Sequence, residues 1–176
     1  MSTLESIGKE DLKELLNLGW MTHDGMWFYH CLKDLGLEAT NRLNLSAVDS
    51  LALFEIPRMR KALGFEKERI ETMAELEAFI NGAFDLIMPR FMRFTHAFVP
   101  PNRMTWKWED GQCFAYKGVR RLGVAEDYRC GVMRRIDRWF ELLGVPFTGP
   151  GVDRCLMHHT GSCGGEYVFH FPGTES

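Results

Sequence analysis

Residues 93–116 read RFTHAFVPPNRMTWKWEDGQCFAY, and this stretch decides the fold because its side chains alternate with a period of two. Phe94 and His96 alternate with smaller or polar residues, and beyond two prolines Trp106 and Trp108 do the same. A period of two is typical of a β-strand with one buried face. The stretch therefore predicts two β-strands, one on each side of the prolines.

The same stretch ends in a predicted hairpin. Asp110-Gly111 is a strong two-residue hairpin turn, and it predicts a third strand that begins just after the glycine. This register places Cys113 beside the tryptophans and therefore puts Phe114 and Tyr116 on the opposite face. Because aromatic side chains would then occupy both faces, we expect one face to be covered by helices and the other by a ligand, a partner subunit or a loop.

Three helical patterns precede the strands. The first is expected to restart near Thr22, and Pro57 is expected to kink or break the second. Thr72 and Glu75 resemble a capping box at the start of the third. The three stretches are 9–35, 38–63 and 73–88.

The remaining residues predict one long helix and a second hairpin. Residues 126–143 carry an apolar stripe with helical spacing. Arms near 152–158 and 166–171 are predicted to pair as strands. The sequence therefore predicts an α+β fold in the strand and helix order β-β-β-α-β-β. It predicts a single domain, 1–176, whose N-terminal helical part (1–90) packs on a C-terminal antiparallel sheet with one long helix (91–176).

The composition is that of an ordinary globular protein, with 45 % hydrophobic residues, 26 % charged residues and a formal net charge of -3. Because this balance offers no strongly basic surface, no nucleic-acid partner is expected. No apolar run is long enough to cross a membrane, and the polar N-terminus lacks the layout of a secretory signal. The chain is therefore expected to be cytoplasmic, with no membrane partner and with its five cysteines reduced.

The first chemical candidate is a group of cysteines and histidines, Cys155, His158, His159 and Cys163. Thiolates and imidazoles are the usual ligands of zinc and related transition metals, so these side chains could close a tetrahedral site. In a regular hairpin, however, Cys155 would lie roughly 10–13 Å from the turn, so the two cysteines could share an ion only outside strand geometry. The alternative is a loop thiol and a buried thiol, with a histidine capping the hairpin.

The second candidate lies in an aromatic part of the first helix. His23 and Trp27 share one face of this helix, and Asp24 and Phe28 share a neighbouring face. His23 could exchange a proton near neutral pH, and Asp24 could orient it or bind a cation. Alternatively, Asp24 stabilises a helix N-terminus and the aromatic residues belong to the core. The predicted ligand pocket between this helix and the sheet is lined by His23, Asp24, Trp27, Phe28, His96, Trp106 and Trp108.

Arginines cluster between residues 120 and 138 and could bind a carboxylate or a phosphate. Arg134, Arg135 and Arg138 avoid the apolar stripe of their helix, which favours a solvated face paired with Glu126, Asp137 and Glu141. No Gly-rich phosphate loop, G-x-S-x-G motif or H-E-x-x-H motif occurs in the sequence. Standard nucleotide-binding and serine-hydrolase functions are therefore disfavoured.

The chain resembles an uncharacterised bacterial family, best represented among anaerobes, whose opening signature is W-x-x-H-D-G-x-W-F. The residues that carry this resemblance are Trp20-x-x-His23-Asp24-Gly25-x-Trp27-Phe28, Cys113-Phe114-Ala115-Tyr116-x-Gly118-Val119, Tyr128-x-Cys130-Gly131, Arg135-Ile136-x-x-Trp139, and Cys155-Leu156-Met157-His158 with Cys163. More distantly, the order of helices before sheet is similar to that of L-2-amino-thiazoline-4-carboxylic acid hydrolase-like proteins and 4-vinyl-reductase-type ligand-binding domains. These remoter resemblances imply a ligand pocket between helices and sheet and transfer no catalytic role to a residue of this chain.

Three functions are consistent with these patterns. The favoured one is binding or sensing of a small molecule in the predicted pocket. The second is hydrolysis of a small cyclic amide or related C–N bond, with a bound zinc or other transition metal, or with His23 and Asp24, activating water. The third is a non-catalytic module that forms a homodimer through the second aromatic face of the sheet.

Overall fold

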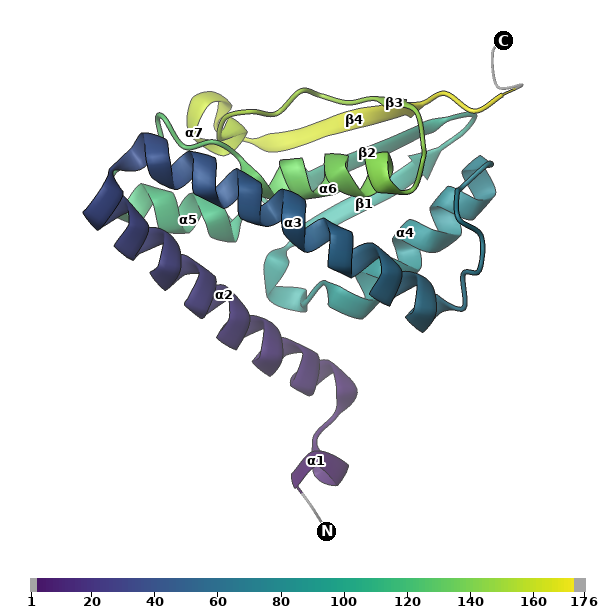
Figure 1. Cartoon of the computed structure of the whole chain (residues 1–176), viewed down its shortest axis with the longest axis horizontal. Helices are drawn as coiled ribbons and strands as arrows, with labels where there is room; N and C mark the ends of the chain where they lie inside the picture. Colours follow the sequence, from purple (N-terminus) through teal and green to yellow (C-terminus); the bar gives the residue numbers. More distant parts are fainter. Residues whose placement is uncertain (1–2, 173–176) are drawn as a thin grey trace.

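The computed structural model describes residues 3–172 and confirms the α+β class, with helices in the first half and an antiparallel sheet in the second (Figure 1). The longer helices are α2 (Lys9–Leu35), α3 (Leu37–Leu63), α4 (Met73–Ile87) and α6 (Gly131–Leu142). The shorter helices are α1 (Thr3–Ser6), η1 (Arg90–Met92), α5 (Phe114–Arg121) and α7 (Leu156–Thr160). The strands are β1 (Phe94–Val99), β2 (Arg103–Trp108), β3 (Phe147–Thr148) and β4 (Cys163–Phe169).

The sheet has the strand order β1-β2-β4-β3, and every neighbouring pair is antiparallel. The predicted alternation of β1 and β2 is confirmed, because Phe94 lies opposite Trp108 and His96 lies opposite Trp106. Tyr167 of β4 is buried on the same inner face. The outer face carries small or polar residues such as Thr95, Lys107 and Glu166. The expectation of aromatic side chains on both faces is therefore wrong.

The predicted third strand is also wrong. The turn at Asp110-Gly111 forms, with Gly111 at φ 74° and a hydrogen bond from the Gln112 amide to the Glu109 carbonyl of 2.9 Å. Beyond it, however, the chain enters α5, and Cys163 of β4 takes the place beside Trp108 that Cys113 was expected to occupy. A hairpin turn fixes the direction of the chain over four residues, whereas the strand pairing is decided by the whole inner face of the sheet.

The second predicted hairpin is wrong in its first arm. Residues 156–160 form α7, and β4 pairs instead with β2 and with the short β3. The predicted second arm is confirmed as the end of β4, where Phe169 is buried as expected. The order after η1 is therefore β-β-α-α-β-α-β, and two short helices accompany the one long helix that was predicted.

The core lies between the inner face of the sheet and the helices that cover it. Phe140 of α6 contacts both Tyr167 and Phe169 of β4, with ring centroids 5.0 Å apart in each pair. Phe84 of α4 reaches Phe94 of β1 at 5.4 Å. Figure 1 shows α6 against the sheet and α3 running alongside α6. Burial of these large rings, together with aliphatic side chains such as Leu76, Ile80 and Met133, holds the two layers together.

Helices α2 and α3 form an antiparallel hairpin around Gly36, whose φ of 79° suits a glycine. The expected restart near Thr22 is wrong, because α2 continues unbroken through it, and the Thr22 hydroxyl donates to the Leu18 carbonyl at 2.7 Å. Of the kink or break expected at Pro57, the break does not occur, since α3 contains this exposed proline within its length. The capping position is confirmed, with the Thr72 side chain accepting from the Glu75 amide at 3.2 Å.

Within residues 3–172, no helix combines the length and the apolar character needed to cross a membrane.

Candidate functional site

Apart from the buried Phe28, the signature residues of α2 lie at the surface, and two of them approach Arg135 of α6. The Trp20 ring packs on the Arg135 guanidinium, whose carbon lies 5.3 Å from the ring centroid. Asp24 is exposed, yet partial desolvation raises its pKa above the ordinary value, although the nearby charges of His23 and Arg135 act in the opposite direction. Trp27 also remains 36 % exposed. The signature therefore marks a contact between α2 and α6.

His96, Trp106 and Trp108 lie together on the inner face of the sheet. His96 Nε2 forms a 2.7 Å hydrogen bond with Asn81 Oδ1, and its ring meets Phe84 edge-on at 4.7 Å. Burial lowers the pKa of His96, so the imidazole is neutral at pH 7. The indole N–H groups of both tryptophans are buried, and neither finds an acceptor among residues 3–172.

The predicted pocket residues are thus divided into two groups. Phe28 points inward from α2 and packs edge-on against Tyr128, with ring centroids 5.8 Å apart. In the described part of the chain, no ring contact or hydrogen bond joins His23, Asp24 or Trp27 to the three residues of the sheet. The structure brings the sheet residues together, and it leaves the polar pair of α2 outside their group.

The predicted metal ligands also separate. Cys155 and Cys163 are buried, whereas both histidines are exposed on α7. His158 Nε2 lies 2.9 Å from a carboxylate oxygen of Glu126, and His159 Nε2 lies 3.1 Å from the carbonyl oxygen of the same residue. Among the residues that the structure describes, no three His, Cys, Asp or Glu side chains are grouped so that they could hold a metal ion. The histidines therefore fasten α7 to the segment before α6.

Four cysteines occupy buried positions near the short helices. Cys113, Cys130 and Cys155 immediately precede α5, α6 and α7, and Cys163 begins β4. Burial raises the pKa of all four thiols, to about 12 for Cys130 and Cys163. For Cys113, Cys130 and Cys163, the nearby cysteines raise the pKa further. These thiols are therefore protonated at neutral pH and are poor nucleophiles.

In the native protein we expect only one thiol, that of the half-buried Cys31, to react readily with Ellman's reagent. The other four should react only as the protein unfolds, because they are both buried and protonated. The measurement is the release of thionitrobenzoate over time, with and without urea. A Cys31→Ser variant should lose the fast phase, and a fast phase of more than one thiol would contradict the burial of the group.

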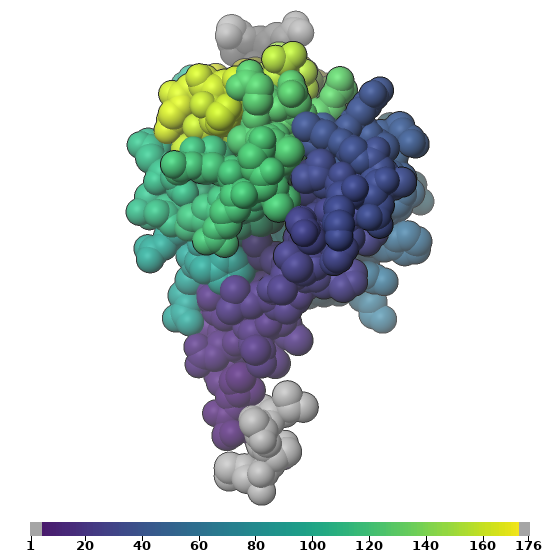
Figure 2. All heavy atoms as spheres, turned by 90° about the vertical axis from the view of Figure 1, so that its left-hand side faces the viewer, coloured from purple at the N-terminus to yellow at the C-terminus, as the bar shows by residue number. Residues whose placement is uncertain are grey.

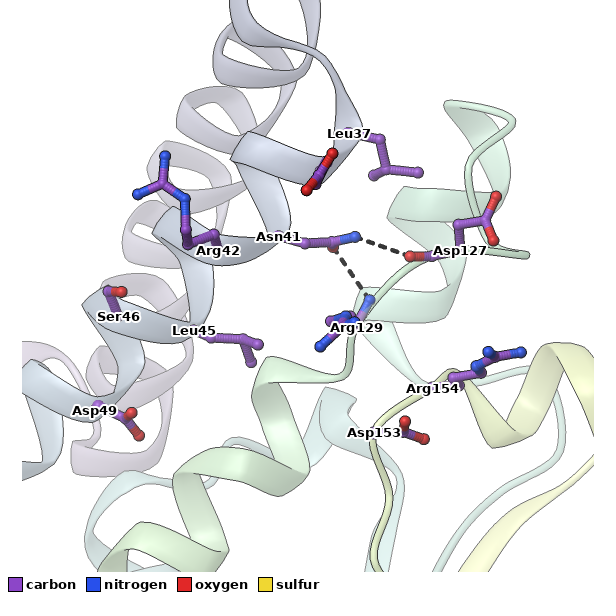
Figure 3. Close-up of a pocket in the computed structure, with 11 residues that line it drawn as sticks. Leu37, Asn41, Arg42, Leu45, Ser46, Asp49, Asp127, Arg129, Asp153 and Arg154 are labelled. Carbon is purple, nitrogen blue, oxygen red and sulfur yellow. Dashed lines mark hydrogen bonds between the residues drawn. The ribbon is translucent and has the colours of Figure 1, made fainter.

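A groove of about 710 Å³ opens between α3 and the segments that lead into α6 and α7 (Figure 3). Asn41 of α3 is buried and holds the facing segment: its Nδ2 donates to the Asp127 carbonyl at 2.8 Å, and its Oδ1 accepts from the Arg129 amide at 3.1 Å. Arg129 also forms an isolated antiparallel bridge with Arg154. Two backbone segments that are far apart in sequence are thereby fixed as one wall of the groove.

The groove is lined by charges of both signs. Arg129 lies in the middle, with Arg42 of α3 on one side and Asp153 and Arg154 of the segment before α7 on the other (Figure 3). The side chains of Arg42 and Arg154 point away from Arg129. Of the lining acids, Asp49 pairs with Arg134 outside the groove at 2.6 Å. In the described part of the chain, no ion pair forms through the remaining charged residues, which are Glu38, Arg42, Asp127, Arg129, Asp153 and Arg154. Opposite charges in one groove are therefore left available to a ligand.

Sequence reasoning found only part of this groove. Arg129 was recognised as a member of the arginine cluster, and the expected pairing of that cluster is confirmed for Arg134 and Arg138, which both bind Glu141. Arg135 instead binds Glu55 of α3. The acids and Asn41 gave no signal, because a charged or amide side chain on a helix resembles any solvated surface position.

Comparison of the chain with protein-family models, with curated proteins and with solved structures returned no match.

Proposed function

We propose that this protein binds a small zwitterionic molecule, such as an amino acid or a short peptide, in the groove between α3 and the segments before α6 and α7. The observation that carries the proposal is the unpaired charge of both signs within a single groove. A guanidinium group of Arg129, Arg42 or Arg154 can hold a carboxylate through two parallel hydrogen bonds. The carboxylate of Asp153 or Asp127 can accept from an ammonium group of the same ligand.

The size of the groove fits this class of ligand. Its 710 Å³ lies within the range of about 300–1,000 Å³ that is typical of small-molecule sites. The mixed charge disfavours a polyanion such as a nucleic acid, which would be repelled by the acids that line the groove. Leu37 and Leu45 of α3 provide a modest apolar surface against which a ligand side chain can pack.

The residue types that line the groove fit ligand binding better than they fit catalysis of hydrolysis. The eleven residues that line the groove include three arginines and four acids, and none of them is a histidine or a cysteine. Four of the five thiols are buried and protonated, and neither Cys31 nor the half-buried His96 of the inner sheet face lines the groove. A general base with a pKa near neutrality is the group that a hydrolase most often needs at its reacting atom.

The proposal is tested by a thermal-shift screen of proteinogenic amino acids and dipeptides, followed by calorimetric titration of those that stabilise the protein. Arg129→Gln and Asp153→Asn should each weaken binding by about 10-fold or more, because each removes a charge-assisted hydrogen bond. Both side chains are exposed and unpaired, so the fold should be retained.

Arg121→Gln is the matched control, because Arg121 is an exposed arginine of α5 that does not line the groove. Its affinity for the same ligand should equal that of the wild-type protein. Binding that survives Arg129→Gln unchanged, or a screen in which no compound raises the melting temperature, would overturn the proposal.

A further inference from the structure

Helix α2 carries a row of large apolar side chains that face water. Leu15, Leu18, Met26 and Tyr29 are between 38 and 60 % exposed. The N-terminal half of α2 extends from the rest of the protein as a narrow projection (Figures 1 and 2). The accessible area of the chain is accordingly 10563 Å², whereas a compact monomer of its mass is expected to expose about 8,800 Å².

These four residues form one stripe. At 3.6 residues per turn they fall, together with Thr22, within an arc of about 80° on the helix surface. Phe28, which anchors α2 in the core, lies about 120° away from the middle of this arc. The stripe therefore points away from the protein that α2 packs against.

The residues of the stripe are arranged symmetrically about Thr22, with similar residue types at equal distances before and after it. Gly19 and Gly25 lie three residues from Thr22, Leu18 and Met26 lie four residues from it, and Leu15 and Tyr29 lie seven residues from it. Eleven residues from it lie Asp11 and Lys33, which fall on the same arc and carry opposite charges. Asp11 also pairs with Arg90 of the same chain at 3.2 Å, and both of these side chains are 68 % exposed. An antiparallel pair of α2 helices centred on Thr22 would therefore place apolar opposite apolar, small opposite small, and acid opposite base.

We propose that a second copy of this chain covers the stripe, with two α2 helices packed antiparallel across a two-fold axis at Thr22. A two-fold interface is isologous, so each contact occurs twice and the surface must be complementary to itself, as this stripe is. A parallel pairing would place Asp11 against Asp11 and Lys33 against Lys33. The two glycines also allow close approach, because a Cβ atom built at either of them meets nothing within 4 Å.

The size of the stripe matches what a stable dimer requires. At roughly 200 Å² for a large apolar side chain, the four residues expose on the order of 400 Å². Each partner in a standard interface buries about 800 Å², a little over half of which is apolar. A membrane surface fits less well, since α2 carries three lysines against five acidic residues and an interfacial helix needs a basic polar face.

Sedimentation equilibrium of the full chain tests the pairing. The wild-type protein should be dimeric, and Leu18→Glu should raise the dimer dissociation constant by at least about 30-fold, because the new charge meets an apolar partner twice per dimer. Leu53→Glu is the matched control: Leu53 is a similarly exposed leucine, but it lies on α3, so the variant should remain dimeric. A wild-type protein that stays monomeric at all concentrations would overturn the proposal.

Two further variants test the register. Lys33→Asp should weaken the dimer by bringing two acids together, and the exchange Asp11→Lys with Lys33→Asp should restore it. Thr22→Cys in a Cys31→Ser background should form a disulfide-linked dimer on mild oxidation much faster than Leu16→Cys, which lies off the stripe. A dimer that shows neither the charge rescue nor this difference in oxidation would refute the antiparallel arrangement.

Discussion

Replacing Glu55 with alanine should lower the free energy of unfolding by about 2–3 kcal/mol, because it removes one partner of a partly buried ion pair and the acceptor of three hydrogen bonds. Glu55 of α3 receives two hydrogen bonds from the Arg135 guanidinium, one of them from Nε at 2.8 Å, and a third from Trp139 Nε1 at 3.0 Å. The side chain of Glu55 is 12 % exposed, and that of Arg135 is 18 % exposed. Without the carboxylate, a partly buried guanidinium and the indole N–H of the buried Trp139 would lose their acceptor.

Arg135 also holds α2 against α6. Its guanidinium carbon lies 5.3 Å from the ring centroids of both Trp20 and Trp139, so one cation links α2, α3 and α6. Each stacking contact adds about 0.5–2 kcal/mol, depending on how well water is excluded. Loss of Glu55 should therefore loosen α2 as well as α3, and faster amide hydrogen exchange along α2 would report this.

Urea denaturation followed by circular dichroism measures the change. Glu141→Ala is the matched control, since Glu141 also binds two arginines of α6, Arg134 and Arg138, but lies in a more exposed network. Glu141→Ala should lower the free energy of unfolding by less than about 1 kcal/mol. Equal losses in the two variants would show that the buried network contributes no more than a surface ion pair.

Local sequence patterns were sufficient for the elements whose neighbours in space are also neighbours in sequence. The alternation of residues 94–108 predicted both strands of the β1–β2 hairpin, because every pair lies within this one stretch, from Val99 opposite Arg103 to Phe94 opposite Trp108. The predicted helical stretches 9–35 and 38–63 end where α2 and α3 end, and the residues that follow, Gly36 and Gly64, both adopt the positive φ that favours glycine. These sequence patterns reflect contacts within one helical turn or one hairpin, so they do not depend on the rest of the fold.

The failures share the opposite cause. The strand beside β2 is β4, about sixty residues further along the chain, and nothing near Asp110-Gly111 indicates that a distant strand will take that position. Glu55 and Arg135 are eighty residues apart, and the groove joins three separate segments. Polar side chains carry no periodic signal, so their partners are set by tertiary packing, and the sequence alone leaves them looking like solvated surface.

Asn41→Ala should lower the free energy of unfolding by about 2–3 kcal/mol and should also open the wall of the groove. Asn41 is buried, and its amide satisfies the Asp127 carbonyl and the Arg129 amide together. Alanine leaves both backbone groups without these partners, and it also removes the amide group that holds the segment before α6 against α3. The measurement is urea denaturation, combined with titration of any ligand found for the groove.

Two variants separate this hydrogen bonding from packing and from helix propensity. Asn17→Ala is the control, because the Asn17 amide donates only to the Lys13 carbonyl of its own helix at 2.9 Å, and its loss should change stability by less than about 0.7 kcal/mol. Asn41→Asp keeps the shape of the side chain but turns the donor that faces the Asp127 carbonyl into an acceptor. It should destabilise the protein at neutral pH at least as much as alanine does. If it were tolerated, the volume of the side chain, and not its pair of hydrogen bonds, would be what holds α3 to the segment before α6.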